Sequence, residues 1–144
     1  MPRSYEILDH TADQILRARG RSPEELLRNL ARGFYLVALG RVPRLRETQQ
    51  QPLELRAPTM EDLVVRLLNE QVFLLYARHQ LALPADDWRV DLENGDWVLR
   101  GSWRLQPHDP QRYPPKTEIK SATYHNLEVR AQGALWETSV TLDI

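Results

Sequence analysis

Apolar residues recur at helical spacing in two stretches of the chain, which predicts two amphipathic helices. The first helix follows Ser22-Pro23, a serine N-cap with proline at the first helical position, and Gly40 is its stop. The second follows Thr59, which has Asp62 in the capping-box position, and is expected to end at 81–84. Its apolar stripe is broad, so this helix is expected to lie deep in the core.

Elsewhere apolar and polar positions alternate, as they do on strands with one buried face. Such runs cover 5–8, 14–19, 52–57, 88–92, 97–105, 118–124, 127–131 and 135–144. Asn94-Gly95 is a favoured pair for a tight hairpin turn, and Gly133 is placed to turn the chain into the last strand. In that last strand Asp143 is expected to point away from the apolar layer. The segments 41–51 and 106–115 show no period and predict loops, the second of them flexible.

The order of these elements predicts an α+β fold. We expect a single-domain sandwich over residues 1–144, with a mainly antiparallel sheet and two helices packed on one side. A chain of 144 residues is long enough to bury a substantial core, and neither an internal repeat nor a domain linker interrupts the pattern.

Composition excludes several classes of protein. The formal net charge is -1, which argues against binding nucleic acid by bulk electrostatics, and the absence of cysteine excludes disulfides and thiolate metal sites. No apolar run is long enough to span a bilayer and the first residues lack the apolar core of a signal peptide, so a cytoplasmic protein without membrane contact is expected. Glycine-rich phosphate loops and the nucleophile elbow of hydrolases are also missing.

Two carboxylates and an imidazole lie within five residues, Asp9-His10-Thr11-Ala12-Asp13, just after the first predicted strand. The last strand ends on Asp143 and Ile144. If the first and last strands are neighbours, Asp13, Asp143 and the terminal carboxylate converge, and repelling oxygens of this kind suit a hard cation such as Ca²⁺ or Mg²⁺. The alternative is a turn, because aspartate side chains often bond their own backbone where strands close.

A second polar group lies between Lys120 and His125. Lys120 is one of only two lysines among 19 basic residues. In a strand Lys120, Ala122 and Tyr124 would share one face. The lysine is then either an exposed cross-strand partner of a carboxylate or, with His125, a contact for phosphate or for an acidic partner surface.

The motifs together resemble those of the archease family. The opening Tyr5-Glu6-Ile7-Leu8-Asp9-His10-Thr11-Ala12-Asp13 is similar to the start of that family, and Leu67-Leu68-Asn69-Glu70 to its central helix. The second half resembles it in Ile119-Lys120-Ser121-Ala122-Thr123-Tyr124-His125 and in the ending Val140-Thr141-Leu142-Asp143-Ile144. The resemblance runs nearly from end to end.

This resemblance implies a non-catalytic cofactor protein for an RtcB-type RNA ligase in tRNA splicing and RNA repair. Such a protein promotes guanylylation and multiple turnover of the ligase, and contact with RNA is then indirect or transient. It also implies a divalent cation held by Asp13, Asp143 and Ile144, with calcium favoured over magnesium or manganese. Asp9 and His10 are then expected to support these ligands without binding the ion themselves. Lys120 and His125 are then expected to contact the ligase or its nucleotide.

The sequence departs from the family pattern at two places. Arg66 and Leu67 stand where an acid and an aromatic are usual, and Tyr113 lies near a position where histidine is common.

Two other functions are alternatives. A metal-dependent phosphohydrolase or nuclease would use Asp9, His10, Asp13 and Asp143 around a metal-bound water. A chaperone or modulator of nucleic-acid-processing proteins would need a large exposed apolar patch, of which the alternating strands give little sign.

Overall fold

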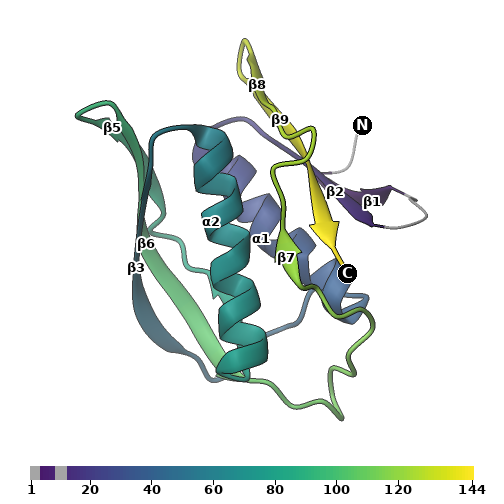
Figure 1. Cartoon of the computed structure of the whole chain (residues 1–144). Helices are drawn as coiled ribbons and strands as arrows, with labels where there is room; N and C mark the ends of the chain where they lie inside the picture. Colours follow the sequence, from purple (N-terminus) through teal and green to yellow (C-terminus); the bar gives the residue numbers. More distant parts are fainter. Residues whose placement is uncertain (1–3, 9–12) are drawn as a thin grey trace.

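The computed structural model describes residues 4–8 and 13–144. The described chain forms two α-helices, a π-helical turn and a set of strands (Figure 1). The helical elements are α1 (Pro23–Leu39), α2 (Met60–Val72) and the π-helical turn η1 (Phe73–Ala77). The strands are β1 (Tyr5–Leu8), β2 (Gln14–Gly20), β3 (Gln49–Ala57), β4 (Gln80–Pro84), β5 (Arg89–Glu93), β6 (Asp96–Pro107), β7 (Ser121–Ala122), β8 (Val129–Gln132) and β9 (Leu135–Asp143).

Local capping chemistry starts both α-helices where the sequence predicts. The Ser22 hydroxyl accepts a hydrogen bond from the backbone N–H of Glu25 (3.1 Å) at the start of α1, and Gly40 ends that helix with φ 79°. At the start of α2 the Thr59 hydroxyl accepts from the N–H of Asp62 (3.0 Å) and donates to its carboxylate (2.9 Å). The predicted caps are confirmed.

The end of the second helix differs from the prediction. Helix α2 continues into η1, and the chain reverses at His79, whose φ is 55°. Residues 81–84, expected to end the helix, form most of strand β4, which pairs with β6 and is buried. An apolar run directly after a helix does not show in the sequence whether it continues the helix or pairs in a sheet, so the strand was missed.

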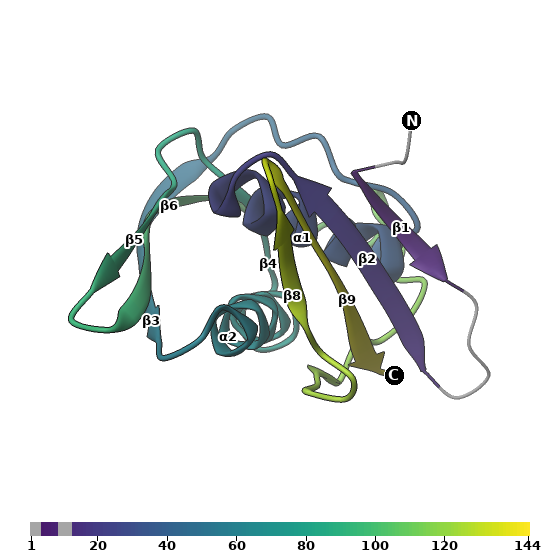
Figure 2. The ribbon, with the colours of Figure 1, turned by 90° about the horizontal axis from the view of Figure 1, so that it is seen from above.

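The strands form two antiparallel sheets. In the first sheet the order is β1-β2-β9-β7, and β8 also pairs with β9; in the second the order is β3-β6-β4, and β5 also pairs with β6. Helix α1 packs mainly on β2, and α2 packs on both β3 and β7, so the helices lie between the sheets (Figure 2). The α+β class with two helices is confirmed. A helix as broadly apolar as α1, which buries side chains around most of its circumference, can be covered on two sides.

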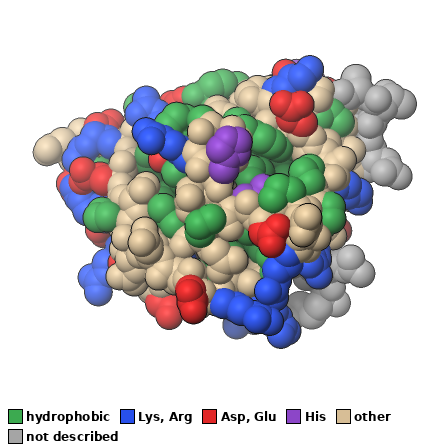
Figure 3. All heavy atoms as spheres, turned by 90° about the horizontal axis from the view of Figure 1, so that it is seen from below, with side chains coloured by type: hydrophobic (Ala, Val, Ile, Leu, Met, Phe, Trp, Pro, Cys, Tyr) green, Lys and Arg blue, Asp and Glu red, His purple; other side chains and the backbone are tan. Residues whose placement is uncertain are grey.

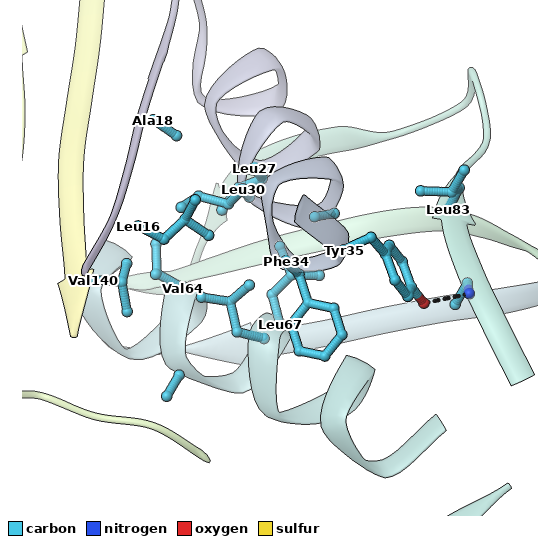
Figure 4. Packing of buried hydrophobic residues seen from close by; sticks show 14 of the residues in the cluster. Leu16, Ala18, Leu27, Leu30, Phe34, Tyr35, Val64, Leu67, Leu83 and Val140 are labelled. Carbon is cyan, nitrogen blue, oxygen red and sulfur yellow. Dashed lines mark hydrogen bonds between the residues drawn. The ribbon is translucent and has the colours of Figure 1, made fainter. Parts of the chain in front are cut away.

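The core is built where α1 crosses the first sheet. Leu16 of β2 and Val140 of β9 face Phe34 of α1 and Leu67 of α2, and all four side chains are fully buried (Figure 4). Gly33 allows the helix to lie this close, because a Cβ atom there would stand 2.6 Å from a methyl carbon of Leu16. The contact fixes β2, and the strands paired with it, against α1.

No helix of the described chain combines the length and apolar character needed to cross a membrane.

Tyr35 joins α1 to the second sheet. Its ring is fully buried, and its hydroxyl accepts a hydrogen bond of 2.6 Å from the backbone N–H of Ala82 in β4 (Figure 4). Burial raises the pKa of Tyr35, so the hydroxyl stays protonated at any pH at which the protein is handled.

We expect Tyr35→Phe to lower the free energy of unfolding by about 1–3 kcal/mol, because the buried N–H of Ala82 would lose its partner. Urea denaturation followed by circular dichroism measures this change. The matched control is Tyr5→Phe, at a half-buried tyrosine, which should shift the unfolding free energy by less than about 0.5 kcal/mol. Equal unfolding free energies for Tyr35→Phe and the parent would contradict the assigned role.

Candidate functional site

The second strand of the N-terminal hairpin, rather than the first, is the neighbour of the last strand. Strands β2 and β9 pair antiparallel from Gln14↔Leu142 to Gly20↔Trp136. Asp13 directly precedes Gln14 and Asp143 directly follows Leu142, so the two aspartates come together at one end of this ladder (Figure 2). Ile144 comes next in the chain at the same end.

The aspartates lie on the face of the sheet that is turned away from the helices. Leu142 is fully buried, whereas Asp143 is exposed and Asp13 is partly exposed. The predicted outward direction of Asp143 is confirmed. Thr141, two residues before Asp143, is nevertheless buried, because the segment that follows β7 covers it and its hydroxyl donates to the carbonyl of His125 (3.4 Å).

Carboxylates at this end of the sheet have no cationic partner among the described residues. Neither Asp13 nor Asp143 forms an ion pair there, although Arg19 binds Glu137 (2.6 Å) farther along the same face. Oxygen donors left without a counter-charge are the ligand type that Ca²⁺ and Mg²⁺ prefer, so the residues fit a hard cation.

Side chains alone do not complete a cation site in the part of the chain that the structure describes. No three His, Asp or Glu side chains gather there closely enough to hold an ion. Asp9 and His10, predicted to stand behind the ligands, lie outside the described residues. An ion at Asp13 and Asp143 would therefore need main-chain oxygens, such as those of Ile144, or water.

Lys120 reaches this end of the sheet from the other side of β9. Strand β7 pairs Ser121 with Asp143, and the N–H of Lys120 donates to the carbonyl of Asp143 (2.8 Å). Asp143 thus lies between the β2 end that carries Asp13 and the segment that carries Lys120 (Figure 1). The Lys120 side chain is exposed.

The predicted strand over 118–124 is wrong in extent, because only Ser121–Ala122 forms β7. The Tyr76 hydroxyl accepts from the N–H of Ile119 (2.9 Å), and the amide group of Asn69 accepts from the N–H of Ala122 (2.8 Å) and donates to its carbonyl (3.4 Å). Side chains of α2 and η1 therefore satisfy backbone groups that a longer strand would have paired.

These clamps also overturn the predicted alternation of side chains. Ile119 and Ala122 are both buried, while Lys120 and Tyr124 are exposed, so Lys120 and Ala122 do not share a face. The clamping residues were missed in the sequence. A polar Asn69 inside the apolar stripe of a deeply buried helix was the available signal, because such a side chain must find a partner.

The first turn of α2 holds the segment after β7. The hydroxyl groups of Tyr124 and Thr59 bond the Asp62 carboxylate and hold its pKa below the usual value, while the same contact raises the pKa of Tyr124. The Glu61 carboxylate accepts from the N–H of Val129 (2.7 Å). His125 is exposed on this segment.

The two departures from the expected family pattern serve the fold. The Arg66 guanidinium donates to the carbonyl of Arg56 and ties α2 to β3, and Leu67 is fully buried. Tyr113 is buried, and its hydroxyl accepts from the N–H of Arg44 (2.9 Å) and donates to the carbonyl of the same residue (3.1 Å).

Comparison with known proteins gives a consistent result over the whole chain. The sequence model of the Archease protein family matches residues 5–144. A protein named archease from Methanosarcina barkeri is 32% identical over 145 aligned positions, which cover 99% of this chain and 97% of the relative. A protein of the same name from Pyrococcus furiosus is 29% identical, with 99% of each chain covered.

Solved structures agree in fold. The solution structure of protein 1598 from Methanobacterium thermoautotrophicum superposes with a TM-score of 0.77 at 22% identity, covering 98% of this chain and 99% of that one. The crystal structure of an archease from Thermotoga maritima, described as a possible chaperone, gives a TM-score of 0.58 at 26% identity, with 95% and 94% covered. On the full-length sequence match, with the fold in agreement, this chain belongs to the archease family.

Proposed function

We propose that the protein is a non-catalytic activator of an RtcB-type RNA ligase, promoting its guanylylation and multiple turnover in tRNA splicing and RNA repair. The supporting observation is the row formed by Asp13, Asp143 and the Lys120 segment across three neighbouring strands. The row brings acidic oxygens and one exposed ammonium group to a single edge of the protein. Membership of the archease family supports the proposal.

Asp13, Asp143 and the main-chain oxygens of Ile144 would hold a divalent cation, with calcium the best match to an all-oxygen donor set. A bound cation of this kind stabilises negative charge on phosphate groups. The protein contributes the two carboxylates and sets their separation through the β2–β9 hydrogen bonds.

Lys120 is proposed to contact a phosphate of the nucleotide or an acidic residue of the ligase, with His125 as a second contact. The backbone on both sides of Lys120 is held by Tyr76 and Asn69, and its own N–H is bonded to Asp143. Holding the backbone in this way reduces the conformational entropy lost when the ammonium group binds.

Calcium should stabilise the protein through the two aspartates. Because an ion that binds only the folded state at about 100 times its dissociation constant adds about 2.7 kcal/mol, the parent protein should unfold at higher urea concentration in calcium than in EDTA. Asp143→Asn should remove most of this difference. The control Asp91→Asn, at an exposed aspartate on β5, should keep it. A calcium effect unchanged in Asp143→Asn would rule out the proposed ligands.

Lys120→Ala should abolish stimulation of ligase turnover while leaving the unfolding free energy within about 0.5 kcal/mol, since the side chain is exposed. RNA joining by a guanylylation-competent ligase under limiting GTP is the assay. Lys120→Arg tests whether a compact ammonium is needed, and Arg89→Ala removes an exposed cation from the other sheet as the matched control. Stimulation by Lys120→Ala equal to that of the parent would reject the role.

Asn69 should act as a positioning residue for Lys120. In Asn69→Leu both hydrogen bonds to Ala122 are lost, and we expect about 1–3 kcal/mol of destabilisation together with weaker ligase stimulation at temperatures where the variant is fully folded. Asn69→Asp keeps the acceptor for the N–H of Ala122 and should restore part of the stimulation. If folded Asn69→Leu stimulated the ligase fully, the clamp would be irrelevant to function.

A further inference from the structure

An apolar pocket of about 220 Å³ opens at the end of the molecule where α1, η1 and the loop over residues 108–120 meet. Its lining comes from Leu39, Leu75, Tyr76, His79, His108 and the prolines Pro110 and Pro115. The face seen from below carries histidine surrounded by hydrophobic side chains (Figure 3). The pocket shares no lining residue with the β2–β9 site.

The loop that closes the pocket is fastened to the rest of the protein. The N–H of His108 donates to the carbonyl of His79 (2.8 Å), and the N–H of Lys116 donates to the carbonyl of Ala38 (2.8 Å). Between these points a ring nitrogen of His108 lies 2.8 Å from the carbonyl oxygen of the buried Tyr113. The pocket is therefore largely preformed, which lowers the entropy cost of filling it.

Basic residues that form no ion pair among the described residues lie next to the lining residues of this pocket in the sequence. Four exposed basic residues flank its lining positions in sequence: Arg41, Arg78, Arg112 and Lys116. None of the four forms an ion pair within the described chain, whereas Arg56 and Arg100, on the second sheet, are both paired with Glu93. The acidic residues on the loop over residues 108–120 are Asp109 and Glu118. This end is therefore net positive, although the whole chain has a net charge of -1.

Aromatic rings hold three of these cations in place. The Arg41 guanidinium lies 4.5 Å from the centre of the Tyr113 ring and that of Arg112 lies 5.7 Å from it, while Arg78 lies 5.4 Å from the centre of the Phe73 ring. Phe73 is 46% exposed. Stacking orients the guanidinium groups, and that of Arg41 also donates to the carbonyl of Arg112 (2.8 Å). Because none of the three pairs with a carboxylate among the described residues, their remaining N–H donors can bind a carboxylate of another molecule.

We propose that this pocket, with its surrounding cations, binds an acidic segment of a partner protein that inserts one leucine or phenylalanine side chain. The volume is below the roughly 300–1,000 Å³ of sites for drug-sized ligands, so a single side chain is the matching occupant. Carboxylates next to that side chain would meet Arg112 and Lys116. A single-stranded nucleic acid fits less well, because it needs open aromatic faces for its bases and the Tyr113 ring is buried and stacked by arginine.

Fluorescence anisotropy with synthetic peptides tests the proposal. The probe is a fluorescein-labelled peptide with a central leucine flanked by glutamates, and the comparison peptide has glycine in place of leucine. Burying the leucine side chain should make the first peptide bind about tenfold more tightly or better, and binding should weaken as salt is added. Equal affinity for both peptides, or preferential binding of a labelled oligouridylate, would overturn the proposal.

Charge reversal and NMR test whether the peptide binds at this pocket. The double variant Arg112→Glu, Lys116→Glu should lose at least about tenfold in affinity through like-charge repulsion, whereas Arg89→Glu, which reverses an exposed cation on β5, should bind as the parent does. In the unmodified protein the imidazole resonances of His79 and His108 should shift with peptide while those of His125 stay in place. An affinity unchanged in the double variant, or shifts at His125 instead, would place any binding elsewhere.

Discussion

The antiparallel pairing of β2 with β9 is the interaction on which the rest of the functional edge depends. It joins residues separated by about 120 positions in the sequence, and it is supported from beneath by the contact of Leu16 and Val140 with α1. Closing so long a loop costs entropy, which the burial of these apolar side chains offsets. Because β9 then pairs with β7, the same ladder also positions Lys120. Weakening the β2–β9 contact would therefore separate every group proposed to act at this edge.

The two candidate sites, the β2–β9 end and the apolar pocket, carry charges of opposite sign. Among the described residues, neither Asp13 nor Asp143 forms an ion pair at the β2–β9 end, and the arginines and the lysine at the pocket end form none either. Elsewhere in the described chain several surface charges are paired, as in the contacts of Arg100 with Glu54 and Glu93. Unpaired like charges gathered at one place repel one another and are a cost to folding, so their presence at two separate places favours a use in binding.

Local features of the fold were predictable because their causes lie within a few residues. The Ser22 and Thr59 caps, the Gly40 stop and the Asn94-Gly95 turn depend only on neighbouring backbone groups, and all are where the sequence indicates. The division of the strands into two sheets was not predictable, because it depends on which strands meet around the helices. Strand β4 was missed for a related reason, since its buried apolar run follows the second helix with no proline or glycine to separate them.

The candidate site shows the same limit. Charge alone suggested that Asp13 and Asp143 could meet, and the strand register brings them to the same end of one ladder. The alternating pattern predicted wrongly that Lys120 and Ala122 share a face, because hydrogen bonds with Asn69 and Tyr76 replace the longer strand that the pattern predicts. The central claim is that one ion links the N-terminal hairpin to the last strand. Titrating calcium into isotopically labelled protein and following backbone amide resonances tests it most directly: signals of Asp13, Asp143 and Lys120 should shift together with one affinity, and shifts confined to other residues, or none, would contradict the account.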